Sequence, residues 1–287
     1  MDISFCIVSL NSIKLLKKCL DSIPCSVKGY SYEVIVADNY SYDDTVGILR
    51  KKYPEVRLIT NNRNIGYTKA MNKILKVSRG KFKVVLNPDS KLMECSISKM
   101  VDFMKNNSMV GVVGPKVVDS YGQFQMSCRR GLARPGAVFS YFFGLAKIFP
   151  KNEKFTGYHL NHLNEDEINQ VSGISGSCML INGKLIEKIG YFDEIFTIYQ
   201  EDSDFCLRSL NNGWRVFYFP KSKVIHIGGH GGSSSYPYRM ILEWHRSYIR
   251  FYFKHFSKEY STVFNSIYLI IMVIKLLLTE IVTLVRK

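Results

Sequence analysis

The stretch that decides the expected fold is Lys83-Val84-Val85-Leu86-Asn87-Pro88-Asp89-Ser90. Its apolar, β-branched run over 84–86 predicts a buried strand. Pro88 ends that strand because its nitrogen has no hydrogen to donate to a neighbouring strand. Asp89 is therefore expected just beyond the carboxyl end of a strand, where open α/β sheets bind their ligands. The alternative is a turn aspartate that bonds its own backbone.

The segments before this strand alternate between strand-like and helix-like patterns. Runs at 3–9, 33–38 and 56–60 predict strands, and apolar spacing predicts helices over 15–23 and 69–75. Such alternation with short connections predicts a parallel or mostly parallel sheet with right-handed crossovers. Polar loop residues should then gather along one sheet edge, where they suit a nucleotide, although each alone is equally typical of a turn: Asn11, Asp38, Asn39, Asn64 and Asp89. No P-loop or dinucleotide motif occurs.

Composition limits the partners of the chain. Its 287 residues are 46% hydrophobic and 22% charged, which is ordinary, but the formal net charge is +15. That surplus favours phosphates, acidic glycans or the anionic face of a membrane. Basic residues are scattered without a nucleic-acid-binding motif, so no nucleic acid partner is expected. The seven cysteines include no CxxC pair, and the N-terminus lacks a signal-peptide pattern, so we expect a cytoplasmic catalytic body.

The second half of the chain begins with a long insertion of weak pattern, 121–170. Its basic pair, Arg129 and Arg130, is expected either to hold a diphosphate or acidic acceptor or to face solvent. After it, Glu201 and Asp202 stand amid aromatic and apolar residues, where burial raises a carboxyl pKa toward that of a working base. Their alternative role is to stabilise the positive end of a helix dipole.

Three further signals follow. Asp204 and Arg208 lie one helical turn apart, which predicts a structural ion pair. His226 ends another apolar strand, where either a ligand or a satisfied core histidine is expected. Glycines on both sides of His230 are typical of a mobile lid.

Taken together, these segments resemble glycosyltransferase family 2, particularly its rhamnosyltransferase-like and galactofuranosyltransferase-like branch, which builds bacterial surface polysaccharides. The segments that carry the resemblance occur in the family's order between residues 3 and 233: Val8-Ser9-Leu10-Asn11, Val34-Ile35-Val36-Ala37-Asp38-Asn39-Tyr40-Ser41, Asn64-Ile65-Gly66-Tyr67 with Ala70 and Asn72, Leu86-Asn87-Pro88-Asp89, Gly190-Tyr191-Phe192-Asp193-Glu194, Tyr199-Gln200-Glu201-Asp202-Ser203-Asp204-Phe205, and His226.

The resemblance implies a GT-A fold, a mostly parallel sheet flanked by helices. It also implies a dTDP- or UDP-sugar donor, a Mg²⁺ or Mn²⁺ ion, and inversion at the anomeric carbon. By position, Asp202 matches the catalytic base, with Glu201 beside it, while Asp89 and His226 match metal ligands. The implied nucleotide-sugar site comprises Ser9, Asn11, Asp38, Asn39, Asn64, Gly66, Asn72, Asn87 and Asp89.

Two positions depart from the family pattern. The metal motif is Asn87-Pro88-Asp89 where many relatives have two or three acidic residues, so Asp89 would work with fewer protein charges. Asn182-Gly183 stands where this branch commonly has a basic pair, so the resemblance does not imply acceptor contacts at this position.

The expected organisation is a catalytic domain over 1–235, with a donor half (1–118) and an acceptor half (119–235), followed by a helical region over 236–287. The run 263–285 is nearly all apolar and exceeds the roughly 20 residues that span a bilayer. Lys275 near its centre is expensive inside a bilayer, so we expect helices that lie on the membrane face. A true span, a core helix and a homodimer through these helices are the alternatives.

The sequence thus predicts an inverting, metal-dependent glycosyltransferase on the inner face of a bacterial cell membrane. It would move a sugar, rhamnose by resemblance, to a hydroxyl of a lipid-linked or growing surface polysaccharide. One alternative is a sugar-1-phosphate nucleotidyltransferase. That class of enzyme requires a glycine-rich phosphate loop after the first strand, and Ser9-Leu10-Asn11-Ser12 is not such a loop. Another is a non-catalytic nucleotide-binding protein associated with the membrane.

Overall fold

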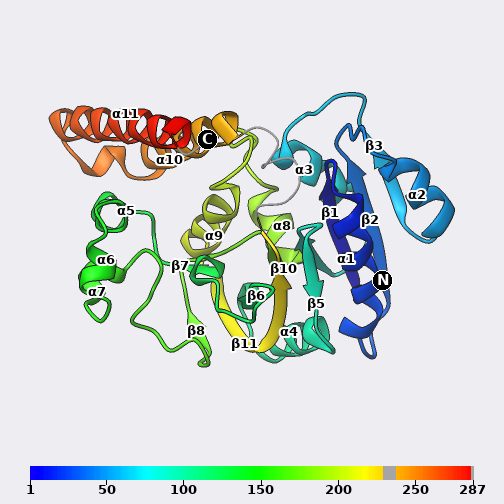
Figure 1. The fold of residues 1–287 in the computed structure, drawn as a ribbon. Coiled ribbons are helices and arrows are strands. Elements are labelled where there is room, and N and C mark those ends of the chain that lie inside the picture. The colour runs from blue at the N-terminus through cyan, green and yellow to red at the C-terminus, as the bar shows by residue number, and fades with distance from the viewer. Residues whose placement is uncertain (229–236, 286–287) are drawn as a thin grey trace.

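A computed structural model describes residues 1–228 and 237–285 (Figure 1). Its first half has the predicted alternation of strands and helices. Four strands pair in parallel in the order β3-β2-β1-β4: β1 (Ile3–Ser9), β2 (Tyr32–Asp38), β3 (Arg57–Thr60) and β4 (Phe82–Leu86). Three helices connect them: α1 (Ile13–Ser26), α2 (Thr45–Lys52) and α3 (Tyr67–Val77). Their carboxyl ends share one sheet edge, as expected.

The second half of the sheet is mixed. β10 (Cys178–Asn182) lies antiparallel to both β4 and β6 (Val110–Val118). β6 is parallel to β11 (Arg215–His226), which in turn pairs antiparallel with β5 (Ser90–Leu92). Parallel pairing therefore holds for the first four strands and for β6 with β11, while β10 and β5 run antiparallel to their neighbours, because the insertion returns the chain at the carboxyl end of β4. There, the first residue of β10 pairs with Leu86.

The remaining elements cover the sheet and build the insertion. Helices α4 (Ser96–Asn106), α8 (Gly183–Ile189) and α9 (Glu201–Asn211) belong to the α/β body. The insertion is less irregular than the sequence indicated, because it holds several short elements: η1 (Met126–Cys128), β7 (Arg129–Arg130), α5 (Pro135–Phe142), α6 (Leu145–Ile148), α7 (Glu153–Thr156), β8 (Asn169–Gln170) and β9 (Gly173–Ile174). β7 pairs with β9, and β8 pairs with β11.

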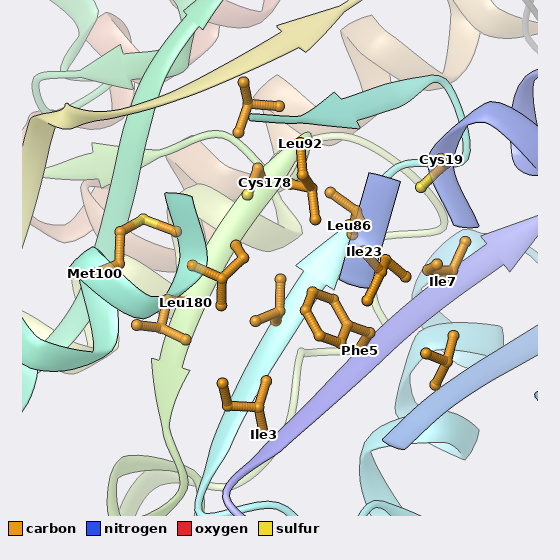
Figure 2. Packing of buried hydrophobic residues seen from close by; sticks show 14 of the residues in the cluster. Ile3, Phe5, Ile7, Cys19, Ile23, Leu86, Leu92, Met100, Cys178 and Leu180 are labelled. Atoms are coloured by element: carbon orange, nitrogen blue, oxygen red, sulfur yellow. The ribbon is translucent and has the colours of Figure 1, made fainter. Parts of the chain in front are cut away.

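Both faces of the sheet are buried, which fixes the positions of the strand ends. Ile3, Phe5 and Ile7 of β1 pack with α1, and Cys6 and Val8 face the opposite side with α3. Figure 2 shows the first of these clusters, where Ile23 lies close to Phe5 and Leu86, which belong to the neighbouring strands β1 and β4. Alternate residues of β1 are thus buried in two different cores. A shift of β1 by one residue would move each side chain to the opposite face of the sheet, so the register of the strand is fixed.

The C-terminal region consists of α10 (Pro237–His255), η2 (Ser257–Glu259) and α11 (Thr262–Val285). A third core cluster joins these helices to the insertion, and the rings of Tyr252 and Tyr268 stack at a centroid distance of 3.9 Å. Figure 1 shows α11 lying along α10, above α5. The expected boundary near 235 and the proposed lid at His230 lie outside the described residues.

One face of α11 packs on α10, and the remainder is exposed and apolar. Only Tyr268 and Met272 of this helix are buried. Its exposed apolar side chains include Ile267, Ile270, Ile274, Leu277, Leu278, Ile281 and Leu284. By length and composition, α11 is the one helix of the described residues able to cross a membrane.

Candidate active site

Asp89 and His226 meet at the carboxyl edge of the sheet. Pairing of β5 with β11 sets Ser90 opposite His226, which brings the preceding Asp89 beside the imidazole. Asp89 is buried, and its Oδ1 lies 3.3 Å from Nε2 of His226. The Asn87 side chain completes this group, with Nδ2 3.4 Å from the same imidazole nitrogen.

Gln125 holds the imidazole from its other side. Oε1 of Gln125 lies 3.0 Å from Nδ1 of His226, and its Nε2 donates to the His226 carbonyl at 2.7 Å. An amide oxygen only accepts, so Nδ1 donates in the first of these contacts, and Nε2 is the ring nitrogen that faces Asp89. Sequence reasoning missed Gln125, since nothing near it in the chain signals a contact 101 residues away.

The Asp89–His226 pair has the chemistry of a divalent-cation site. A carboxylate oxygen and a neutral imidazole nitrogen are both ligands for Mg²⁺ or Mn²⁺. Their separation of 3.3 Å is close to the distance of about 3 Å between adjacent ligands in an octahedral shell. The described residues hold no cluster of three or more His, Cys, Asp or Glu arranged for a metal, so the rest of the shell would come from a ligand and water.

Asp202 lies at the start of α9, directly after a sharp turn of the backbone. Tyr199 and Gln200 both adopt left-handed conformations, with φ of 66° and 62°, which are uncommon for residues other than glycine and mark functional turns. Asp202 is buried, and its Oδ2 accepts from Nη2 of Arg130 and from the Gly176 amide at 3.0 Å. Its Oδ1 accepts from the Ser203 amide at 2.7 Å.

Glu201 is buried beside this pair without a comparable partner. Burial raises the pKa of Glu201, and the neighbouring Asp202 charge raises it further. Among residues 1–228 and 237–285, its Oε2 has no hydrogen-bond partner, and neither has the buried hydroxyl of Tyr67. Gly176 lies against all three groups: a Cβ there would stand 3.6 Å from the Tyr67 hydroxyl and within 4.0 Å of both carboxylates. Buried polar atoms left unpaired in this way are candidate contacts for a ligand.

The two clusters face one cavity of about 300 Å³. His226 and Asn87 line one part of it, and Asp202, Glu201 and Arg130 line another. Asp89 does not line this cavity itself and lies behind His226, at 3.3 Å from the imidazole. Asn87 and Asp202, which are far apart in the chain, thus line a single space, whereas a shared pocket for Asp89 and Asp202 stays a prediction.

Arg129 and Arg130 have different surroundings. Arg130 lines the cavity, and the Asp202 carboxylate raises the pKa of Arg130 even though burial alone would lower it. Arg129 is buried elsewhere, donates to the carbonyls of Leu163 and Asn164 at 2.6 and 2.9 Å, and stacks on Tyr218. The expectations of a ligand-binding or solvent-facing role are therefore wrong for Arg129, because its guanidinium is buried and donates its hydrogen bonds to loop carbonyls.

The residues predicted for the nucleotide gather at the ends of β1 and β2. Asp38 is buried; its Oδ2 accepts from the Ser41 amide at 3.1 Å, and its Oδ1 has no hydrogen-bond partner in the part of the chain that the structure describes. Asn11 accepts from the Tyr42 amide at 2.9 Å. Ser9 contributes a buried hydroxyl 2.9 Å from that of Ser12. Of these three residues, Asp38 therefore offers an oxygen that is free to bind the base or ribose of a nucleotide.

Other predicted donor residues have their amides engaged within the protein. Asn39 donates to Asn64 Oδ1 at 3.0 Å, and the Gly66 amide donates to the same oxygen at 3.0 Å. Asn72 exchanges two hydrogen bonds with the Phe192 backbone, at 2.9 and 3.2 Å. These residues hold the loops that shape the site, and their direct contact with a donor stays a prediction.

Asp204 confirms the predicted ion pair and extends it. Its Oδ2 accepts from Nε of Arg208 at 2.8 Å, and its Oδ1 contacts Lys254 at 2.5 Å and His255 at 2.7 Å. Despite burial, hydrogen bonds from His255, Lys254 and Arg208 lower the pKa of Asp204 to about 2. Lys254 and His255 come from α10, so this buried carboxylate ties the C-terminal helices to the catalytic body.

This sheet order and its edge site define the GT-A fold of the nucleotide-sugar transferases. Among solved structures, that of GalNAc-T7 with UDP, GalNAc and Mn²⁺ superposes with a TM-score of 0.62 at 15% identity, covering 88% of this chain and 47% of that one. The chain belongs to glycosyl transferase family 2, whose model matches residues 4–190. It is a glycosyltransferase, and the nucleotidyltransferase and non-catalytic alternatives are set aside.

Two relatives carry rhamnosyl names. The chain is 31% identical over 213 residues to N-acetylglucosaminyl-diphospho-decaprenol L-rhamnosyltransferase of Mycobacterium tuberculosis, covering 69% of this chain and 67% of that protein. It is 25% identical over 218 residues to dTDP-rhamnosyl transferase RfbF of Shigella flexneri, covering 74% and 65%. The chain thus matches about two thirds of the length of each.

Proposed function

We propose that this glycosyltransferase moves a sugar, rhamnose as the first choice, from a nucleotide-diphospho-sugar to a hydroxyl of a lipid-linked glycan, with inversion. The observation that carries the proposal is the single cavity bounded by His226, with Asp89 behind it, and by Asp202. The names of the two relatives support rhamnose, a dTDP donor and a diphospho-lipid acceptor.

The donor nucleotide would bind at the ends of β1 and β2. Asp38 offers a buried oxygen without a partner, which suits a ribose hydroxyl or a base N–H. Asn11 and Asn64 hold the adjoining loops in place. This arrangement sets the nucleotide at the carboxyl edge of the parallel strands, where α/β sheets bind such ligands.

Asp89 and His226 would hold a Mg²⁺ or Mn²⁺ ion next to the donor. When bound, such an ion supplies positive charge that stabilises the diphosphate leaving group. The structural relative solved with UDP and Mn²⁺ supports this role. Gln125 would hold the His226 ring with Nε2 aimed at the site.

Asp202 would act as the base for the acceptor hydroxyl. Its carboxylate takes the hydroxyl proton as the acceptor oxygen bonds to the anomeric carbon, and the bond from that carbon to the diphosphate oxygen breaks on the opposite side. One base and no covalent intermediate suffice for such a single displacement, following the stereochemical logic of inverting glycosidases. Arg130 and the Gly176 amide hold the carboxylate in place during the approach.

Glu201 would contact the sugar rather than take the proton. Its raised pKa favours a carboxyl group that can donate as well as accept a hydrogen bond. Its Oε1 and the Tyr67 hydroxyl lie toward Gly176, and its Oε2 and that hydroxyl are buried without a hydrogen-bond partner among the described residues. Vicinal sugar hydroxyls satisfy paired donors and acceptors of this kind.

The C-terminal region would attach the enzyme to the inner face of the cell membrane. The exposed apolar side chains of α11 and the net charge of +15 support adsorption to an anionic bilayer. We retain the division into a catalytic part over 1–235 and a membrane-associating part over 236–287.

A thermal-shift panel of nucleotide sugars, with and without Mn²⁺, tests the proposal directly. A donor that binds the folded state raises the melting temperature by mass action. We expect the largest shift for dTDP-rhamnose with Mn²⁺, followed by turnover of that donor. No shift with any dTDP- or UDP-sugar would overturn the proposed activity.

A further inference from the structure

A second cavity of about 480 Å³ lies beside the catalytic one, between the insertion and the C-terminal helices. We call it the C-terminal cavity. Its walls come from α5 and α6 on one side and from α10 and α11 on the other. Tyr199 and Trp244 line both cavities. A molecule that fills the C-terminal cavity therefore reaches the catalytic cavity at these two side chains.

Two lysines give the C-terminal cavity a positive charge. Lys275 belongs to the apolar helix α11, but its side chain faces the cavity, where Nζ lies 5.3 Å from the centre of the Phe142 ring. Lys147 contributes from α6. None of the ion pairs found within residues 1–228 and 237–285 involves either lysine. Both ammonium groups are thus available to an anion.

His245 adds a buried group that lacks a partner. It is 2% exposed, lines the C-terminal cavity, and has Nδ1 2.8 Å from the Ile241 carbonyl. Nδ1 donates to that carbonyl, because a carbonyl oxygen only accepts, and burial lowers the pKa of His245, which favours the uncharged ring with Nε2 as an acceptor. Within residues 1–228 and 237–285, Nε2 has no hydrogen-bond partner. Buried polar atoms are rarely left unpaired, and a sugar hydroxyl is a suitable donor here.

The apolar surface of α11 begins next to this charge. Ile274, Leu278 and Ile281 share one face of the helix on one side of Lys275, and all three are more than half exposed. A ligand for this region must therefore combine an anion, a hydroxyl-bearing group and a long apolar chain. These three chemistries occur together in a glycan linked through a diphosphate to a polyprenyl chain.

We propose that the C-terminal cavity binds the diphosphate of a polyprenyl-diphosphate-linked acceptor, with Lys147 and Lys275 on the phosphate oxygens. The acceptor sugar then extends past Trp244 toward Asp202, and the prenyl chain follows the exposed face of α11. This inference rests on the proposed function and names its acceptor class. It also accounts for Lys275, a charge that an apolar helix on a membrane surface does not otherwise need.

Calorimetric titration of the full-length protein tests the site with farnesyl diphosphate, farnesol and inorganic diphosphate as probes. We expect farnesyl diphosphate to bind more tightly than either of the others, because it alone carries both a diphosphate and an apolar prenyl chain. Lys275→Met and Lys147→Met should each weaken that binding by about tenfold, the loss of one charge-assisted contact. Lys258→Met removes the same charge from the exposed turn between α10 and α11 and should leave binding unchanged.

Three results would overturn the site. The first is equal binding of farnesol and farnesyl diphosphate with no effect of either lysine substitution, which would mean an apolar surface only. The second is complete displacement of farnesyl diphosphate by UDP, which would place the diphosphate in the donor site. The third is complete displacement by vesicles of phosphatidylglycerol, which would identify a headgroup site.

Nucleotide binding separates this inference from the proposed function. If the wild-type protein binds dTDP or UDP but not farnesyl diphosphate, the acceptor site is wrong and the transferase proposal stands. If it binds no nucleotide and turns over no donor, the transferase proposal itself fails.

Discussion

Arg130 donates from Nη2 to Oδ2 of Asp202 inside the catalytic cavity, although the two residues lie 72 positions apart. The pair joins the insertion, where Arg130 belongs to β7, to the first turn of α9. The same carboxylate oxygen accepts from the Gly176 amide. The Asp202 carboxyl group is thus held in a fixed orientation, which is what the proposed general base needs before an acceptor arrives.

Asp202→Asn should abolish most of the transfer while leaving the fold intact. Asn can keep an acceptor toward the Gly176 amide but cannot take up a proton, so we expect a loss of about 10²- to 10⁴-fold in kcat. Single-turnover transfer from dTDP-rhamnose measures this loss, with circular dichroism as the check on folding. Glu55→Gln removes an exposed carboxylate and should behave like the wild type. Unchanged turnover in Asp202→Asn would remove Asp202 as the base.

Arg130→Met should destabilise the folded protein and lower the rate of sugar transfer. The variant leaves the Asp202 charge buried without its main partner, a change that typically costs about 3 kcal/mol or more. Urea unfolding of Arg130→Met, Asp202→Asn and the double variant gives the coupling between the two residues. We expect the double variant to be more stable than the sum of the single losses implies; strictly additive losses would contradict the pairing.

Gln125→Ala should weaken Mn²⁺ binding without removing any ligand. The His226 ring loses the acceptor for its Nδ1 proton, and losing such an outer partner typically costs 10- to 100-fold in metal affinity. Mn²⁺ titration followed by electron paramagnetic resonance, in the presence of UDP, measures the effect. Gln123→Ala, two positions away on an exposed turn, is the matched control. Asp89→Asn and His226→Ala should lose more affinity than Gln125→Ala.

Stability should fall in acid as Asp204 is protonated. Because the folded-state pKa of Asp204 is about 2 and its ordinary value is 3.8, its charge stabilises the fold above about pH 4. That contribution, on the order of 2 kcal/mol, is lost as the pH falls from there toward 2. Thermal unfolding between pH 6 and pH 2 measures it. Asp204→Asn should be less stable at neutral pH and show a shallower acid dependence; the wild-type slope in this variant would assign the effect to other groups.

Vesicle binding should depend on the exposed face of α11. The triple variant Ile274→Gln, Leu278→Gln and Ile281→Gln removes apolar side chains that are 51%, 56% and 55% exposed, so folding should be little affected. Sedimentation with phosphatidylglycerol vesicles should show binding weakened by about tenfold or more. A control with Met109→Gln, Tyr121→Gln and Ile168→Gln alters exposed apolar residues of the catalytic body. Equal losses in both variants would contradict a specific membrane face.

Much of the fold followed from the sequence because its signals are local. The apolar runs of β1, β2 and β4 are bounded by polar or proline residues, and the helices between them show three-and-four spacing. Asp38 and Asp89 stand at strand ends in the sequence itself, so their common sheet edge could be inferred before any coordinates. The helix spacing of Asp204 and Arg208 likewise sufficed for their ion pair.

Only the tertiary structure decided which distant groups share a space. The antiparallel entry of β10, the pairing of Gln125 with His226, and the separation of Arg129 from Arg130 all depend on how the insertion folds back. No local pattern encodes such contacts, because they join segments that are far apart in the chain and are fixed by packing of the whole core. The sequence alone determined the strand ends and the carboxylates that follow them, and packing decided which charge faces each of those carboxylates.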